Sequence, residues 1–351
     1  MKRLLLALLA VTAVFTLAAC GEEDTGFAIA MITDAGDIDD ESFNQGTWEG
    51  IVEYAEANDI THKYYRPAEV SDEAYLETID LAVEGGAEII VTPGFLFEVA
   101  IYNAQTKYPD INFVLIDGVP HAGDYATYNI ESNTQSILFD EHESGFLAGY
   151  AAVKEGFTNL GFMGGIAVPA VVRFGVGYVA GAYTAADELG IDITVDNYEY
   201  LGNFDASDEH KIKAAAWFET GVEIIFAAAG GAGSSVMAAA EDVGASAIGV
   251  DVDQNGLSDT VLTSAMKDLG TAVQTALIDH FEGTFTGGDT LQMNAANDGV
   301  GLPMDTSRFE TFTTADYDDI FGRVPNIDIP TNQDELVTFL DDLGVTWTIV
   351  E

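Results

Sequence analysis

The chain contains EGGAEII at residues 84–90 and, at an offset of 135 residues, ETGVEII at residues 219–225. Each segment leads from a polar turn into an apolar run with β-branched residues, which is typical of a buried strand. A second pair keeps nearly the same spacing, because Ile116-Asp117 and Val250-Asp251 lie 134 residues apart. The sequence therefore predicts two similar halves, each with an aspartate directly after a buried strand.

Around these segments, short apolar runs alternate with amphipathic stretches, which is typical of an α/β protein with parallel sheets. We expect buried strands at residues 27–32, 89–91, 113–116, 160–163, 224–226 and 248–250, and helices near residues 75–83, 99–106 and 236–243. Ligands of parallel sheets bind at the carboxyl ends of the strands. Two facing sheets would therefore form a cleft with Asp117 on one wall and Asp251 on the other.

The polar loop at residues 33–45, TDAGDIDDESFNQ, is the densest candidate for a binding site. It leads into the first helix, which we expect to begin at Ser42 with the serine hydroxyl as its cap. Its carboxylates would repel phosphate, so the loop suits a neutral ligand with hydroxyl or amine groups. The outer residues Asp37, Asp39, Asp40 and Glu41 are interpreted as partners of the helix dipole rather than of a ligand.

Two further positions are candidates for ligand contacts. Residues 230–235, GGAGSS, would let the backbone approach a ligand closely, or they form only a tight turn; the lysine of a phosphate-binding loop is missing. Lys267 follows an apolar strand in a chain with only 12 basic residues. Beside Asp251 it would hold a carboxylate ionised in a half-buried cleft, and a surface lysine that screens acidic neighbours is the alternative.

The sequence shows no motif for catalysis or metal binding. The five histidines lack metal-ligand spacing, no G-x-S-x-G elbow occurs, and the acidic loop lacks the glycine and closing glutamate of a calcium loop. Residues 140–143, DEHE, are interpreted as the solvated start of a helix, and His280 as a packed structural histidine. We therefore expect a protein that is not an enzyme and uses no metal or cofactor.

Charge excludes one large class of partners. The formal net charge is −47, from 59 acidic and 12 basic side chains, and no cationic cluster is available to bind nucleic acid. An acidic, lysine-poor surface repels itself in dilute buffer, and molar salt screens that repulsion. We therefore predict a halophilic source. Hydrophobic residues make up 48% of the chain, which is enough for a folded protein despite the charge.

The first twenty residues resemble an export signal. Lys2 and Arg3 precede an apolar run that is too short to span a bilayer, and Cys20, the single cysteine of the chain, follows small residues. This pattern resembles a lipoprotein signal, in which residues 1–19 are removed and Cys20 carries the lipid. An ordinary secretory signal is the alternative. Cleavage would leave 332 residues, so two domains are expected.

Several motifs together resemble one family, the basic membrane protein family of lipoproteins, similar to the purine nucleoside receptor A substrate-binding proteins of ABC transporters. They lie at residues 33–34, 40–45, 145–150, 202–205, 229–233, 249–254, 262–264 and 267. The resemblance implies a two-lobed type I periplasmic binding fold with a hinge of several strands. Residues 20–26 would be a lipid-anchored linker, residues 27–130 and 251–290 one lobe, and residues 131–250 and 291–351 the other.

The resemblance also implies the roles of site residues. Phe43 and Phe204 would stack on a purine, and Asp34, Asn44 and Asp117 would meet polar edges of the ligand. Asp251 and Lys267 would hold ribose hydroxyls, and Gly231 would bring the backbone close. Ala232, Ser234-Ser235 and residues 168–170 depart from the usual family pattern, which leaves base selectivity open.

We therefore expect a monomer that binds guanosine, inosine or adenosine and delivers it to an ABC transporter permease. It would be anchored to the cell membrane by the lipid on Cys20 and face the periplasm or cell exterior. A sugar or signal-molecule receptor of the same fold, a membrane sensor and an exported nucleoside hydrolase are the alternatives.

Overall fold

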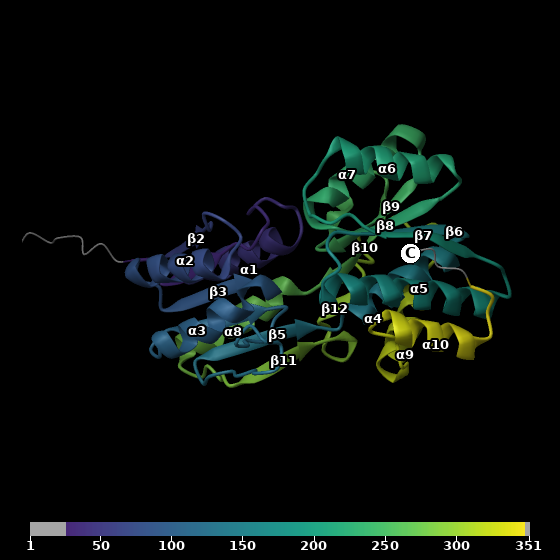
Figure 1. Ribbon diagram of the computed structural model, residues 1–351. Helices are drawn as coiled ribbons and strands as arrows, with labels where there is room; N and C mark the ends of the chain where they lie inside the picture. Colours follow the sequence, from purple (N-terminus) through teal and green to yellow (C-terminus); the bar gives the residue numbers. More distant parts are fainter. Residues whose placement is uncertain (1–25, 348–351) are drawn as a thin grey trace, which may run out of the picture.

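The computed structural model describes residues 26–347, which form two lobes, each built on a six-stranded sheet (Figure 1). Strand order is β11-β5-β4-β3-β1-β2 in the first sheet and β12-β10-β9-β8-β6-β7 in the second. Within these residues every strand pair is parallel except β10 with β12. The predicted α/β class with parallel sheets is confirmed.

The strands are short, as is usual for parallel sheets. In the first sheet they are β1 (Ile29–Ile32), β2 (His62–Tyr65), β3 (Ile89–Pro93), β4 (Asn112–Ile116), β5 (Thr134–Phe139) and β11 (Asp289–Met293). In the second they are β6 (Asn159–Gly164), β7 (Thr194–Tyr200), β8 (Ile224–Ala228), β9 (Ser246–Asp251), β10 (Val261–Lys267) and β12 (Val300–Gly301). All six predicted strands are present.

Helices cover both faces of each sheet, which explains why the central strands are apolar along their whole length. Along β1, Ile29 and Met31 pack with the core on the side of α1 and α8, while Ala30 and Ile32 pack with α2 and α3. In the second lobe α4 pairs with α5, and α6 with α7. These helices are α1 (Phe43–Ala57), α2 (Asp72–Glu84), α3 (Glu98–Lys107), α4 (Glu141–Glu155), α5 (Pro169–Leu189), α6 (Asp208–Glu219), α7 (Gly233–Val243) and α8 (Leu269–Glu282).

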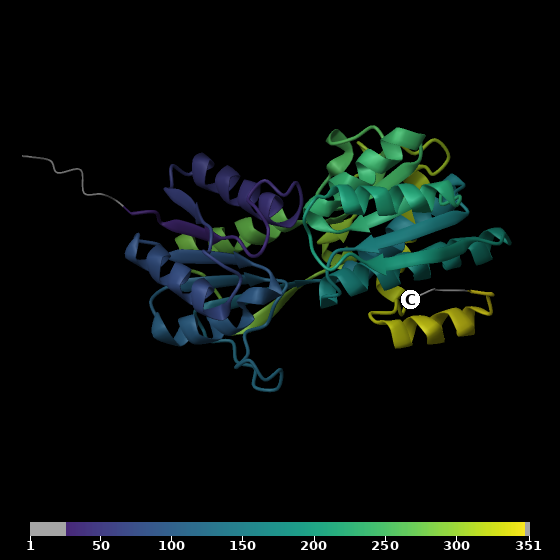
Figure 2. The same ribbon diagram turned by 45° about the horizontal axis from the view of Figure 1, so that its top comes forward.

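Two final helices, α9 (Thr314–Arg323) and α10 (Gln333–Leu343), lie against the second lobe in both views (Figures 1 and 2). They pack on α4 and α5 respectively. The end of the described chain therefore belongs to the second lobe, as expected.

Within residues 26–347 the chain crosses between the lobes three times, after β5, after β10 and after β11. The expected boundaries near residues 131, 251 and 290 therefore need correction. Residues 134–139 pair with β4 in the first sheet, and residues 261–267 pair with β9 in the second. Because strand pairing decides lobe membership, the crossings lie near residues 140, 268 and 294–299. The expected signal and anchor, residues 1–19 and Cys20, lie outside the described residues.

Candidate ligand-binding site

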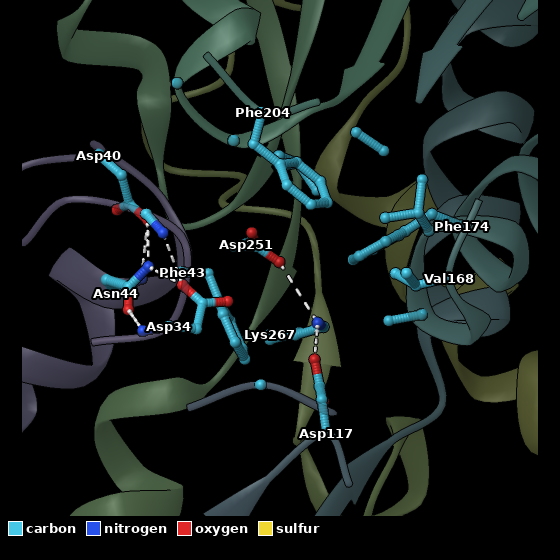
Figure 3. Close-up of a pocket in the computed structure, with 18 of the residues that line it drawn as sticks. Asp34, Asp40, Phe43, Asn44, Asp117, Val168, Phe174, Phe204, Asp251 and Lys267 are labelled. Atoms are coloured by element: carbon cyan, nitrogen blue, oxygen red, sulfur yellow. Dashed lines mark hydrogen bonds and ion pairs between the residues drawn. The ribbon is translucent and has the colours of Figure 1, made fainter. Parts of the chain in front are cut away.

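A cavity of about 290 Å³ lies between the lobes at the carboxyl ends of their strands (Figure 3). Its volume is near the lower end of the range of about 300–1,000 Å³ that is usual for small-molecule sites. Every site residue expected from the sequence lines it: Asp34, Phe43, Asn44, Asp117, Phe204, Gly231, Asp251 and Lys267. The structure thus brings together residues that lie up to 233 positions apart in the chain.

One wall is the loop between β1 and α1. Asp40 accepts hydrogen bonds from the backbone N–H groups of Ser42, Asn44 and Gln45, at 2.9, 3.0 and 3.0 Å. It therefore satisfies the free donors at the start of α1, in agreement with the expected helix-dipole role. The expected cap was wrong, because the Ser42 hydroxyl donates to Asp251 instead.

Asp34 and Asn44 form a hydrogen-bonded pair on this wall. Nδ2 of Asn44 donates to Oδ1 of Asp34 and to Oδ2 of Asp40, each at 2.9 Å. Burial raises the pKa of Asp34, although its hydrogen bonds to Gly36 and Asn44 oppose this. Gly94 makes room for Asp34: a Cβ there would lie 2.9 Å from Oδ2, and its φ of 111° also favours glycine.

At the centre of the cavity, Lys267 is buried among three carboxylates. Nζ lies 2.6 Å from Oδ2 of Asp117, 3.5 Å from Oδ1 of Asp251 and 3.6 Å from Oε1 of Glu141. Burial alone would lower the pKa of Lys267, but these three carboxylates raise it above the usual lysine value. The ammonium therefore stays charged, and the surface-lysine alternative is wrong because only 4% of Lys267 is exposed.

Asp117 and Asp251 occupy equivalent places in the two lobes. Asp117 follows β4, Asp251 is the last residue of β9, and each has a left-handed backbone, with φ of 57° and 65° respectively. Among the described residues, Oδ1 of Asp117 has no hydrogen-bond partner although it is buried. Such an atom is costly unless a ligand or water bonds it, so it points to a ligand with a donor at this place.

The lobes also contact each other directly beside the cavity. The fully buried Ser42 donates from Oγ to Oδ2 of Asp251 at 2.6 Å. Nε2 of Gln254 donates to the carbonyl of Glu41 at 2.7 Å. Since Ser42 and Glu41 belong to the first lobe and the other two residues to the second, these two hydrogen bonds join the lobes.

Aromatic rings border the cavity from both lobes (Figure 3). Phe43 begins α1, Phe204 lies in the loop after β7, and Phe174 lies on α5. A Cβ at Gly165 would lie 2.2 Å from the Phe204 ring, so glycine there gives the ring its place. Nζ of Lys267 lies 4.8 Å from the centre of the Phe43 ring, which is within cation–π range.

The residues of the site that sequence reasoning missed include Glu141, Arg173 and Phe174. The interpretation of residues 140–143 as solvated was wrong for the buried Glu143, which accepts a hydrogen bond from the backbone N–H of Ala295. It was also wrong for Glu141, which is 1% exposed and accepts a hydrogen bond from Nη1 of Arg173 at 3.3 Å. The sequence did offer a signal for Glu141, which lies two residues after the end of β5, because strand ends border ligand sites. Arg173 and Phe174 carried no such signal, since they lie within a helix.

Two classes of feature are not found in the described part of the chain. Residues 26–347 contain no group of three or more histidine, cysteine or acidic side chains arranged to hold a metal ion. Within the same residues, no helix has the length and apolar character needed to cross a membrane. Asp117 and Glu141 are instead paired with Lys267 and Arg173, and Asp34 is hydrogen-bonded to the amide of Asn44.

Residues 27–330 match the protein family described as ABC transporter substrate-binding protein, PnrA-like. The ABC transporter nucleoside-binding protein BmpA of Lactococcus lactis subsp. cremoris is 31% identical over 344 residues, covering 88% of this chain and 94% of that protein. Basic membrane protein A of Borreliella burgdorferi is 29% identical over 352 residues, covering 97% of this chain and 99% of that protein.

The fold also resembles a solved structure, that of ABC transporter system solute-binding proteins from Aeropyrum pernix K1. The TM-score is 0.71 at 23% identity, with 90% of this chain and 89% of that chain covered. Together with the sheet topology, this similarity confirms the expected two-lobed, type I periplasmic binding fold.

Proposed function

Since the chain belongs to the family of PnrA-like substrate-binding proteins of ABC transporters, we propose that it binds a purine nucleoside between its two lobes for uptake through a permease. Its relative in Lactococcus lactis is named as nucleoside-binding. The proposal makes it a receptor that closes on its ligand and releases it unchanged, without turnover.

The observation that carries this proposal is the pair of Phe43 and Phe204, one from each lobe, at the same cavity. A flat purine between two such rings gains roughly 1–3 kcal/mol of stacking free energy per ring, judged from aromatic contacts to bases elsewhere. Because the rings come from different lobes, stacking on both requires closure. Base binding would thus stabilise the closed form.

The sugar would lie over the strand-end aspartates. Ribose offers neighbouring hydroxyl donors, and carboxylate oxygens accept such donors strongly. Oδ1 of Asp117 is an unused acceptor, and Oδ1 of Asp251 faces the same cavity from the other lobe. Nζ of Lys267 lies within ion-pair distance of both carboxylates.

The base edge would meet Asp34 and Asn44, which offer carboxylate and amide oxygens to purine N–H groups. The carboxylates of Asp34, Asp40, Asp117, Glu141 and Asp251 outnumber the two cations, Lys267 and Arg173, at the cavity. This excess of negative charge disfavours phosphate, so nucleosides are proposed over nucleotides. Guanosine, inosine and adenosine remain the candidates.

The protein would act outside the cytoplasm as a lipid-anchored monomer. Cys20 would carry the lipid, and a permease in the same membrane would receive the ligand. The test is the distribution of the full chain with Cys20→Ser after expression in a bacterial host. Release of the variant from the membrane, with the unaltered chain retained, is expected; equal retention would contradict the anchor.

Ligand choice is tested by isothermal titration of the chain from residue 21 onward, in molar salt. The ligands are guanosine, inosine, adenosine, cytidine, ribose and free guanine. One-to-one binding of purine nucleosides, with ribose and guanine much weaker, is expected. A folded sample that binds ribose but no nucleoside would support a sugar receptor, and release of free base would support a hydrolase.

A further inference from the structure

Glu141 is the first residue of α4, directly after the chain leaves the first sheet at Phe139. It is buried and lines the cavity. The hinge crossing therefore places a third carboxylate at the site, in addition to the two strand-end carboxylates of Asp117 and Asp251.

The two oxygens of Glu141 contact two different cations. Oε1 lies 3.6 Å from Nζ of Lys267 at the end of β10, and Oε2 accepts from Nη1 of Arg173 on α5 at 3.3 Å. Arg173 is 31% exposed and lines the cavity. One buried carboxylate thus ties together the two cations of the site.

We infer that Glu141 is a positioning residue: it holds Lys267 and Arg173 to one side, so that Asp117 and Asp251 keep oxygens free for ligand hydroxyls. This inference rests on the proposed function. Without the charge of Glu141, Lys267 keeps the carboxylates of Asp117 and Asp251 as partners, and Arg173 is still attracted by the carboxylate of Asp117. The two cations would turn toward these carboxylates and occupy the acceptor oxygens that ribose needs.

The surroundings of Glu141 make the charge of its carboxylate sensitive to pH. Lys267, Arg173, Asp117 and Asp251 face the cluster from β10, α5 and the ends of β4 and β9. Burial raises the pKa of Glu141 to about 7, Lys267 and Arg173 oppose this rise, and Asp117 adds to it.

The neighbouring charges do not offset this effect. Along α4, burial lowers the pKa of His142, which faces Asp140, Arg173 and Glu335, so this histidine is neutral near pH 7. Glu141 therefore loses its charge on mild acidification, while Lys267 keeps its own.

The first arm of the test measures guanosine affinity between pH 6 and pH 8.5 by isothermal titration. The unaltered protein should bind about tenfold more weakly at pH 6 than at pH 8, the scale of one charge-assisted hydrogen bond. Glu141→Gln should bind weakly at every pH, because glutamine mimics the protonated acid. Equal affinity and an equal pH profile in the two proteins would overturn the inference.

Glu155→Gln is the matched control, since it removes one charge from the far end of the same helix. Glu155 binds backbone N–H groups of residues 310–312, away from the cavity. It should retain the affinity and pH profile of the unaltered protein. A loss equal to that of Glu141→Gln would assign the effect to α4 as a whole and would overturn the inference.

The second arm needs no ligand and no variant. NMR of the unaltered protein follows the carboxyl ¹³C signal of Glu141 and the guanidinium ¹⁵N signals of Arg173 through the same pH range. Both should change with one midpoint. If the Arg173 signals do not change while Glu141 titrates, the inference is overturned even if nucleosides bind. Failure of nucleosides to bind, with the two signals still coupled, would reject the proposed function alone.

Discussion

Lys267 and Asp117 join the two lobes, with Nζ of the lysine 2.6 Å from Oδ2 of the aspartate. Lys267 ends strand β10 of the second sheet, and Asp117 follows β4 of the first. Both side chains are nearly inaccessible to solvent, at 3% and 9% exposed. The pair therefore contributes to folding as well as to the site.

Replacement of Lys267 by methionine should destabilise the protein strongly. Three carboxylates would remain buried without their cation, and loss of one partner of a buried ion pair costs about 3–5 kcal/mol. The measurement is the free energy of unfolding in urea. Lys213→Met is the control, because its pair with Glu199 is partly exposed and should contribute at most about 1 kcal/mol. Equal losses in both variants would contradict the buried role.

Replacement of Phe204 by alanine should weaken nucleoside binding by about 1–3 kcal/mol, because one stacking face is lost. Titration with guanosine and with ribose separates stacking from sugar contacts, since ribose affinity should stay the same. Phe281→Ala is the control, because Phe281 stacks on Tyr54 away from the cavity. Unchanged guanosine affinity in Phe204→Ala would remove this ring from the site.

Replacement of Asp251 by asparagine should cost more affinity for guanosine than for free guanine. The carboxylate would accept ribose hydroxyls that the free base lacks, and an amide accepts them less strongly. Asp253→Asn serves as control, because Asp253 binds Asn255 and Thr306 outside the cavity. An equal loss for riboside and base would contradict the sugar assignment.

Folding stability should fall as pH rises toward 7 through the titration of Glu141. Burial raises the pKa of Glu141 from its ordinary value of 4.5 to about 7 in the folded protein, so the folded state binds the extra proton. The resulting stabilisation is complete below pH 4.5 and is lost as pH rises to 7. The measurement is the free energy of unfolding of the ligand-free protein against pH.

Glu141→Gln isolates this contribution, because glutamine does not titrate. The difference in free energy of unfolding between the two proteins should change between pH 5 and pH 7.5. The unaltered protein should become less stable relative to the variant as pH rises. A constant difference would show that Glu141 does not titrate in this range.

Stability should increase with salt concentration, because the formal net charge is −47. Concentrated counterions shorten the screening length to about 3 Å at 1 M and reduce repulsion between surface carboxylates. The measurement is the melting temperature in NaCl from dilute buffer to molar concentrations, with sucrose as a control for general osmolyte effects. A melting temperature that is constant or falls with NaCl would reject the prediction of a halophilic source.

Local sequence was enough to predict most of the frame of the site. Asp117 and Asp251 follow β-branched apolar runs, and the carboxyl end of a parallel strand is a ligand site whatever the rest of the fold does. Phe43 and Asn44 begin a helix after such a strand. Lys267 was a candidate because of its position after an apolar strand. Phe204 needed the family resemblance, because its role depends on which residues face it across the cavity.

The α/β class, the two similar halves and the strand-end residues could be predicted from the order of residues, because these features follow from short-range periodicity. The tertiary structure alone decided the lobe crossings, since strand pairing between distant segments places β5 in the first sheet and β10 in the second. It also decided that Ser42 bonds Asp251 and that Glu141 is buried between Lys267 and Arg173. These contacts join residues distant in the chain, and no local pattern of residues encodes such partners.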